Sequence, residues 1–355
     1  MAQFPLAGLQ VPAVGASTVA AFFLRNEVIR LNGPAVFPDD SDAERPFKPH
    51  YDAHILPDVE RFEADRLAAL GTFRSRCFMG VPAIIAVAIV AIVILAMAGG
   101  GEDFILGGAV VICVFIAGWM IHPVTTYKAG VKEIVFPKIF SFFGSDYEYS
   151  PQGRLQISGL KPSGILPSYD IESTEDYVRG SHRDVGIELT EATLSERRNS
   201  GKRRTTVVVF KGIFVLLAMN KSFSGKTIVK RDQGMIGNWF ASKISDMETV
   251  RLEDPVFEKQ FEVSSTDQVE ARYLLTTSFM ERLLKLAALL GDGKLQCSFY
   301  DNKLLIMVPS SHNRFETSSI FKPSTFVEDI DTIIKEMREI FAIVEMLKLH
   351  ERTGL

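Results

Sequence analysis

The sequence predicts an α+β protein in which a transmembrane helical hairpin is followed by a cytoplasmic region of two antiparallel α+β units. Three observations support this prediction: two long stretches without a charged residue, short alternating strands separated by turns after residue 121, and helix-capping patterns towards the end of the chain. The mean hydropathy of +0.14 is high for a chain of 355 residues, and the two uncharged stretches account for it.

The composition excludes several classes of protein. A hydrophobic content of 47% excludes a disordered or fibrous chain. The three cysteines, Cys77, Cys113 and Cys297, are odd in number and far apart, so they do not form a disulfide framework. They also offer no pair of thiols at the spacing of metal ligands. We therefore expect no cofactor and no metal.

Residues 1–56 are expected to form a poorly structured segment, because six prolines among the first fifty residues interrupt regular structure. His50 and His54 have the spacing that places two imidazoles on one face of a helix, and Asp52 lies between them. Two histidines without a third ligand do not predict a metal site. The default expectation is that both histidines are solvated.

An amphipathic juxtamembrane helix is predicted over residues 57–76. Asp58 and Glu60 lie near its start, where carboxylates interact favourably with the helix dipole. Its apolar residues recur near helical spacing, so the helix runs into, or packs beside, the first membrane span. These apolar residues include Val59, Phe62, Leu70 and Phe73.

Residues 77–121 predict a transmembrane helical hairpin with spans at 78–98 and 104–121. Neither span contains a charged residue, and at 1.5 Å per residue each is about as long as the roughly 30 Å hydrocarbon core of a bilayer. The short link between them joins only antiparallel neighbours. A helix of a soluble core carries a polar stripe, and these stretches lack one. They also lack the ionisable side chains that mark an ion or proton path.

The charges around the hairpin predict its orientation. The short link carries Glu102 and Asp103 and no basic residue, whereas basic residues flank the hairpin at both outer ends. The positive-inside rule therefore places both termini in the cytoplasm of a multi-pass protein. Trp119, near the inner end of the second span, is typical of an interfacial anchor. The flanking basic residues are Arg61, Arg66, Arg74, Arg76, Lys128, Lys132 and Lys138.

Residues 140–250 predict a mainly antiparallel β unit. Strands are expected near 184–194 and 204–219, joined by a hairpin turn at Asn199-Ser200-Gly201. Lys226–Lys230 predicts a further strand. Few helical patterns intervene, which favours antiparallel pairing.

Residues 251–355 predict a second α+β unit. Val256–Val263 is expected to be a strand, and residues 294–300 and 303–308 a hairpin around Asp301-Asn302. Capping boxes are expected to begin helices at Asp267, Ser278 and Thr325, and Gly291 to end the second of them. The last helix is long and amphipathic, with an apolar face that includes Ile330, Ile333, Ile334, Met337, Ile340, Phe341, Val344 and Leu347.

The run from Val256 to Arg282 (VFEKQFEVSSTDQVEARYLLTTSFMER) resembles the signature of a bacterial membrane-protein family, known as a domain of unknown function, family 3137 (DUF3137). Phe210–Phe214 leading to Phe223–Thr227, and Glu175–Gly180, resemble it as well. The resemblance covers roughly residues 55–350. It implies a double span followed by a cytoplasmic domain at the bacterial inner membrane. The family has no assigned activity, so the resemblance transfers no functional residue.

Known catalytic motifs are not matched. Gly225-Lys226-Thr227 resembles the end of a phosphate-binding loop, but position 220, where the leading glycine belongs, is asparagine, and a strand follows instead of a helix. No nucleophile elbow occurs, and the six histidines are spread along the chain, with His182 and His312 in polar segments of the cytoplasmic region. We therefore identify no catalytic residue and lean against an enzyme.

A basic segment is the best candidate for a contact site. Between Arg197 and Arg231 the chain has ten basic residues and no acidic one. Such a segment lies on a solvated loop, or it contacts anionic lipid, where each basic residue contributes about 1 kcal/mol. Phosphates of nucleic acid attract the same charges, but no interleaved aromatics or binding motif occur, so nucleic acid is not expected. The candidate lipid or partner contacts are Arg197, Arg198, Lys202, Arg203 and Arg204.

The sequence thus favours a non-enzymatic inner-membrane protein whose cytoplasmic domain contacts a protein partner or anionic lipid headgroups. One alternative is a membrane-bound, hydrolase-like enzyme with a site between the two cytoplasmic units. Another is a small accessory subunit of an envelope or transport complex that uses the uncharged spans for helix packing.

Overall fold

The computed structural model describes residues 46–97, 102–200, 203–219, 222–231, 247–289, 295–311, 313–317, 319–347 and 349. These residues fall into two compact units. The hairpin unit holds residues 58–129 and 319–325, and the sheet unit holds residues 46–57, 130–317 and 326–349. Of the predicted N-terminal segment, residues 1–45 lie outside the described residues.

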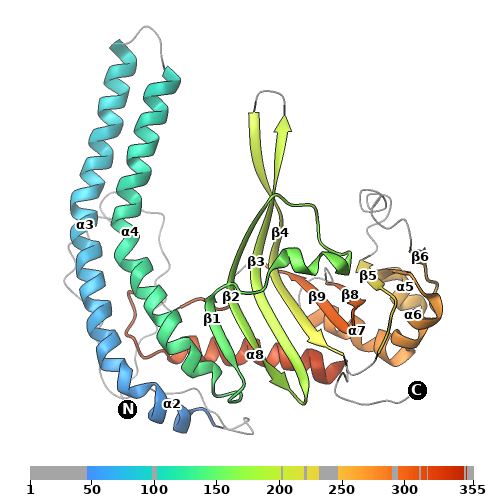
Figure 1. Ribbon diagram of the computed structural model, residues 1–355. Coiled ribbons are helices and arrows are strands. Elements are labelled where there is room, and N and C mark those ends of the chain that lie inside the picture. The colour runs from blue at the N-terminus through green and yellow to red at the C-terminus, as the bar shows by residue number, and fades with distance from the viewer. Residues whose placement is uncertain are drawn as a thin grey trace. The chain divides into compact units, whose positions relative to one another are not determined.

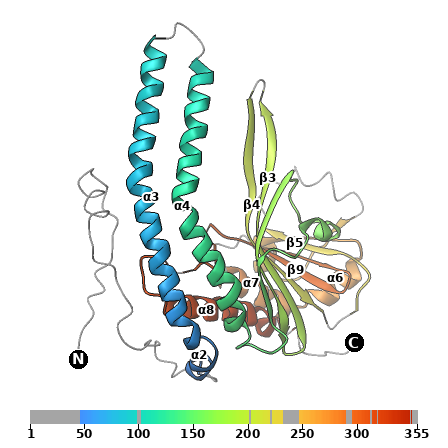
Figure 2. The same cartoon turned by 60° about the vertical axis from the view of Figure 1, so that its left-hand side comes forward.

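The hairpin unit contains most of two long antiparallel helices, α3 (Leu56–Met97) and α4 (Glu102–Phe140), which lie side by side in Figures 1 and 2. Residues 130–140 of α4 belong to the sheet unit. Both helices are long and apolar enough to cross a membrane, and their apolar stretches are almost wholly exposed. The helices approach closely at Gly80, where a Cβ atom would collide with the Met120 side chain. The predicted helix 57–76 and the predicted span 78–98 are one continuous helix.

A short segment from late in the chain completes the base of the hairpin unit. Arg66 is fully buried; it pairs with Glu63 at 2.7 Å and donates to the Ile320 carbonyl at 2.8 Å. The Ser324 backbone N–H donates to the same Glu63 carboxylate at 2.9 Å, and Tyr127 of α4 lies 2.5 Å from the Ser324 hydroxyl. Burying an arginine is costly unless its charge and N–H groups are matched, and residues 319–325 supply part of that match.

The sheet unit contains nine described strands in one antiparallel sheet, in the order β1-β2-β3-β4-β9-β8-β5-β7-β6. The expected α+β class with an antiparallel sheet is confirmed. The sheet joins the ranges 140–250 and 251–355, because β5 lies between β8 and β7. The strands are β1 (Glu148–Gln152), β2 (Ile171–His182), β3 (Val185–Ser200), β4 (Arg203–Ala218), β5 (Thr227–Arg231), β6 (Glu248–Thr249), β7 (Phe261–Ser265), β8 (Gln296–Tyr300) and β9 (Lys303–Pro309).

Side-chain alternation gives the sheet two buried faces. On one face, Phe214 and Leu305 pack against Ile157 and Leu160 of a short 3-10 helix, η2 (Ile157–Ser163). On the other face, Phe299 of β8 contacts Phe279 at a ring distance of 5.7 Å. The helices of this unit are α2 (Lys48–His54), α5 (Pro255–Gln260), α6 (Gln268–Leu274), α7 (Thr277–Leu289) and α8 (Val327–Met346).

Two predicted hairpins are confirmed. Strands β3 and β4 pair from Ile187 with Leu217 to Ser200 with Arg203, which confirms the hairpin. Asn199 and Ser200, predicted as part of its turn, are instead paired residues of β3, and the two positions between the paired ends lie outside the described residues. Strands β8 and β9 meet at Asp301 and Asn302, whose φ angles of 49° and 56° suit a two-residue hairpin.

Some local predictions are wrong. Residues 255–260 form helix α5 rather than the start of a strand, because Asp254 caps the N–H groups of Val256 and Phe257, and Pro255 occupies the first helical position. Strand β7 begins only at Phe261. The cap at Asp267 is confirmed, but Thr276, not Ser278, accepts the N–H of Phe279.

The predicted cap of the last helix is also wrong. Helix α8 begins at Val327, after Phe326, which has a left-handed backbone (φ 59°) and provides no side-chain cap, so Thr325 is not the capping residue. The predicted apolar face of this helix is nevertheless buried at most of its positions, including Ile330, Met337 and Val344. Gly291, the predicted end of the second helix, lies outside the described residues.

Candidate functional site

The predicted basic contact lies at the end of a two-stranded extension of the sheet. Pairing of β3 with β2 stops at Ser195, and pairing of β4 with β9 stops at Gly212. Beyond these positions residues 196–200 pair only with residues 203–207 among the described residues. We call residues 196–207 the basic arm; Figures 1 and 2 show it projecting beyond the rest of the sheet.

The register of the arm concentrates positive charge near its tip. Arg197 pairs with Thr206 and Arg198 with Thr205, while Arg203 and Arg204 open β4 directly opposite the end of β3. Arg197 and Arg198 are exposed. The arm therefore brings four of the five predicted contact residues onto one narrow ribbon. The fifth, Lys202, lies outside the described residues.

Local contacts hold the base of the arm. The Arg197 backbone N–H donates to the Asp170 carboxylate at 2.7 Å. The Arg198 side chain forms an ion pair with Glu196 at 2.9 Å, with the arginine side chain 55% exposed. An exposed pair of this kind contributes little stability, so Arg198 keeps most of its capacity to attract an external anion.

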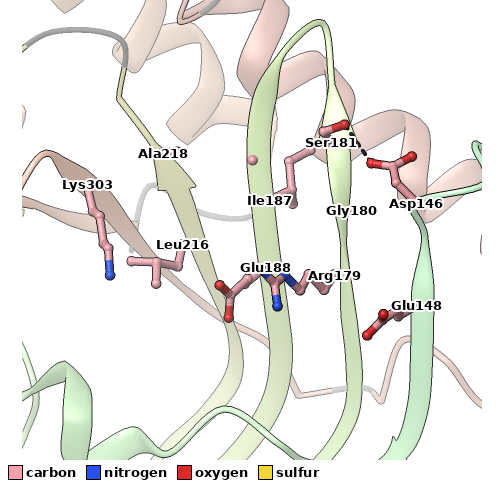
Figure 3. A pocket seen from close by; sticks show the side chains of 11 residues that line it. Asp146, Glu148, Arg179, Gly180, Ser181, Ile187, Glu188, Leu216, Ala218 and Lys303 are labelled. Atoms are coloured by element: carbon pink, nitrogen blue, oxygen red, sulfur yellow. Dashed lines mark hydrogen bonds between the residues drawn. The ribbon is translucent and has the colours of Figure 1, made fainter.

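A groove of about 630 Å³ with charged residues in its lining lies over strands β1 to β4 and reaches Lys303 of β9. Figure 3 shows Glu148, Arg179 and Glu188 across neighbouring strands, with Lys303 at the far side. The Ser181 hydroxyl donates to the Asp146 carboxylate at 2.6 Å at the other end. The groove thus presents charges of both signs, and its hydroxyl is bound to a carboxylate rather than to a histidine. The sequence did not indicate this groove, because its residues come from five segments, at or near β1, β2, β3, β4 and β9.

A buried ionic network lies inside the sheet unit, and sequence reasoning missed it. Asp176 is fully buried at a bulge in β2 with a left-handed backbone (φ 52°). Its carboxylate accepts from Lys132 of α4 at 2.6 Å and from the Tyr149 hydroxyl at 2.5 Å. Burial raises the pKa of Asp176, and the Lys132 charge opposes that rise. The network fastens the end of α4 to the sheet.

More carboxylates extend this network towards α8. Glu191 accepts the backbone N–H groups of Arg314 and Phe315, and burial raises its pKa to about 6. Burial raises the pKa of Glu336 to about 8, because the nearby Arg314 charge only partly offsets desolvation. The Arg314 side chain pairs instead with Glu339 at 2.8 Å. Glu191 is buried, and the Arg314, Glu336 and Glu339 residues are partly buried.

The candidate histidines occupy structural positions. His182 stacks on Phe341 at a ring distance of 4.3 Å and contacts Glu345 at 3.0 Å. His50 contacts the Lys138 carbonyl at 2.7 Å, and its ring lies 4.5 Å from that of His54, so His50 is partly buried rather than solvated. His312 lies outside the described residues. Within the described ranges, no three histidine, cysteine or carboxylate side chains form a group suited to a metal ion.

Comparison with known proteins gives a family match over part of the chain and no activity. Residues 208–349 match the model of a family described as a protein of unknown function, DUF3137, which confirms the resemblance over that part of the chain. No curated protein matches the chain. A solved structure, the mycobacterial trehalose monomycolate transport factor A, TtfA, aligns at 11% identity over 57% of this chain and 88% of that chain, with a TM-score of 0.29. A score this low carries no argument about fold or function.

Proposed function

Starting from a chain whose residues 208–349 carry a DUF3137 domain, we propose that the protein is a two-span protein of the bacterial inner membrane with both termini in the cytoplasm. Its sheet unit is then a cytoplasmic binding domain, and the basic arm contacts anionic lipid headgroups of the same membrane. The observation that carries this proposal is the arm itself, a ribbon that extends beyond the sheet and has four arginine positions near its tip.

The exposed surface of the hairpin unit supports insertion into a membrane. Phe78, Phe104 and Phe115 are 73%, 92% and 76% exposed, and many aliphatic side chains of α3 and α4 are similarly uncovered. Burying one such side chain is worth roughly 1.5–3 kcal/mol. Insertion into a bilayer removes the whole uncharged surface from water and so gains this free energy for each of these side chains.

The basic residues at the open end of the hairpin support the orientation. Arg66 and Lys132 are engaged in ion pairs, so their positions are explained by packing. Arg61, Arg74 and Arg76 still lie on the same side of the first span, whereas the link between the spans has no basic residue. This distribution favours a cytoplasmic location for that end.

The charge of the arm supports lipid as its ligand. Each arginine near an anionic surface contributes about 1 kcal/mol, so four contribute roughly 4 kcal/mol at low salt. Screening within a Debye length of about 8–10 Å weakens the attraction at physiological salt. The contact is therefore expected to be reversible and sensitive to salt.

The test uses the full chain in nanodiscs of phosphatidylcholine alone or mixed with phosphatidylglycerol. A fluorophore on Thr205→Cys, in a chain whose native cysteines are replaced by alanine, reports proximity to nitroxide-labelled headgroups. We expect stronger quenching with phosphatidylglycerol, and loss of the difference in high salt or after joint reversal of Arg197, Arg198, Arg203 and Arg204 to glutamate. Equal quenching in both lipids at low salt would refute the assignment.

A protein partner is the second candidate ligand. The outer edges of residues 196–200 and 203–211 carry no strand neighbour in the described part of the chain, and an open edge can accept an extended segment of another protein. Co-purification of a defined subunit in mild detergent, lost when the arm is replaced by a short turn, would favour this role or that of an accessory subunit.

A further inference from the structure

A groove on the hairpin unit lies at the end of the spans where the chain is basic. It has a volume of about 550 Å³ and is lined by Arg76, Val114, Phe115, Gly118, Trp119 and His122. Arg76 comes from α3 and all the other residues from α4. The groove therefore combines a cationic end with an apolar wall, at a depth where a bilayer changes from hydrocarbon to headgroup.

The position of Arg76 follows from a proline in α4. Pro123 lies four residues after Trp119 and has no N–H, so the Trp119 carbonyl loses its normal helical partner. Arg76 replaces that partner: its Nη1 donates to the Trp119 oxygen at 2.7 Å. The guanidinium carbon also lies 5.0 Å from the centre of the Trp119 ring, a cation–π distance. The charge is thus fixed at the mouth of the groove.

This arrangement leaves Arg76 able to bind an anion. A guanidinium has five N–H groups, and among the described residues it makes the single hydrogen bond to Trp119. The remaining donors suit a phosphate, which arginine binds through two parallel hydrogen bonds. His122 adds a second polar group at the same end.

The apolar part of the groove offers an open wall on α4 that suits an acyl chain. Val114, Gly118 and His122 recur at intervals of four residues and so share one face of α4. A Cβ atom added at Gly118 would meet no atom within 4 Å. The missing side chain therefore keeps the wall open, and Phe115, 76% exposed, extends it along the span.

We propose that this groove binds one anionic glycerophospholipid, with its phosphate on Arg76 and an acyl chain along Val114, Phe115 and Gly118. The volume falls in the range of ligand pockets. The positive charge lies at one end of the groove and the apolar wall extends from it, as the phosphate and the acyl chain do in a phospholipid. The proposal rests on membrane insertion of the hairpin unit, but it does not depend on the basic arm.

The experiment measures lipid selectivity at Trp119 in the full chain. Trp239→Phe leaves Trp119 as the single tryptophan. Its fluorescence is quenched in nanodiscs by phosphatidylglycerol or phosphatidylcholine with brominated acyl chains, and the ratio of the two binding constants is compared. One cationic contact predicts a preference of about fivefold for phosphatidylglycerol.

Three variants locate the source of the preference. Arg76→Gln should reduce it to near unity. Gly118→Leu should do the same by filling the groove while retaining the charge, which keeps the test valid if Arg76→Gln folds poorly. Gly108→Leu is the matched control, because its added Cβ atom also meets no atom within 4 Å, and it should keep the preference.

The possible outcomes separate this proposal from the function proposed above. Equal quenching by the two lipids, or an unchanged preference in Gly118→Leu, would refute the groove as a lipid site while leaving membrane insertion intact. No quenching by either lipid would refute insertion. Loss of the preference on reversal of the four arm arginines would assign it to the arm and overturn this inference.

Discussion

Replacing Lys132 with methionine should destabilise the sheet unit strongly. Lys132 supplies the positive charge for Asp176, whose side chain is 0% exposed. Methionine keeps much of the apolar stem of lysine, so the substitution mainly removes the ammonium group. Removing one partner of a buried ion pair costs about 3–5 kcal/mol, because the other charge stays desolvated.

The two partners should respond differently to substitution. The Lys132 side chain is 14% exposed and retains a path to water, whereas Asp176 has none. Asp176→Asn should therefore cost less than Lys132→Met. Asparagine also tolerates the left-handed backbone at position 176 and can still accept from the Tyr149 hydroxyl. The double variant should be more stable than Lys132→Met alone.

Thermal unfolding of the full chain in detergent, followed by circular dichroism, measures these effects. For a unit of this size 1 kcal/mol shifts Tm by about 2–4 °C, so Lys132→Met should lower Tm by about 6–20 °C. Without Lys132 the pKa of Asp176 rises further, and the protonated acid needs no partner. The loss should therefore be larger at pH 8 than at pH 5, since a raised folded-state pKa removes stability as pH rises.

The exposed Lys335→Met on α8 provides the control and should leave Tm within about 2 °C of the parent protein. Equal stability of Lys132→Met and Lys335→Met would refute the claim that the Asp176 charge depends on Lys132. A loss independent of pH would show that packing, and not charge, is responsible.

Two further predictions concern the same unit. Gly212→Ala should lower Tm sharply, because φ is +154° and the new Cβ atom would collide with the Val308 carbonyl. Gly186→Ala is the control and should be nearly neutral, because the nearest atom to its added Cβ lies at 3.5 Å. Equal Tm values for the two variants would contradict this prediction. Glu336→Gln should have a higher Tm than the parent protein at pH 9 and the same Tm near pH 4.5. The reason is that a folded-state pKa of about 8 for Glu336 makes the parent lose stability as pH rises. The same dependence of Tm on pH in both proteins would contradict this prediction.

Local patterns in the sequence predicted the elements that depend on nearby residues. The uncharged stretches correspond to the exposed parts of α3 and α4, and the hairpin predicted around Asn199-Ser200-Gly201 is formed by β3 and β4. Helix α5 replaces the first part of the strand expected at residues 256–263, because the Asp254 cap and Pro255 at the first helical position favour a helix there. The capping signal Asp254-Pro255 is itself local and is present in the sequence.

The order of the strands in the sheet could not be predicted from local sequence patterns. The position of β5 between β8 and β7 depends on contacts far apart in the chain, and no local pattern specifies them. Asp176 has the same limitation: it lies in a polar run and looks like a solvated carboxylate until Lys132 and Tyr149 are seen against it. The basic charge of residues 197–204 was predictable because it is a property of the sequence alone, whereas the extension of this hairpin beyond the sheet depends on where its neighbouring strands end.

The contact between Arg66 and Ile320 spans 254 positions of the chain, and this separation has a consequence for biogenesis. A ribosome adding about 5–20 residues per second needs roughly 10–50 s to make that length. Both apolar helices are synthesised well before residues 319–325 exist, so during this interval the buried arginine lacks one of its native acceptors. A nascent chain stalled before residue 319 should therefore be more susceptible to quality-control proteases than the finished protein.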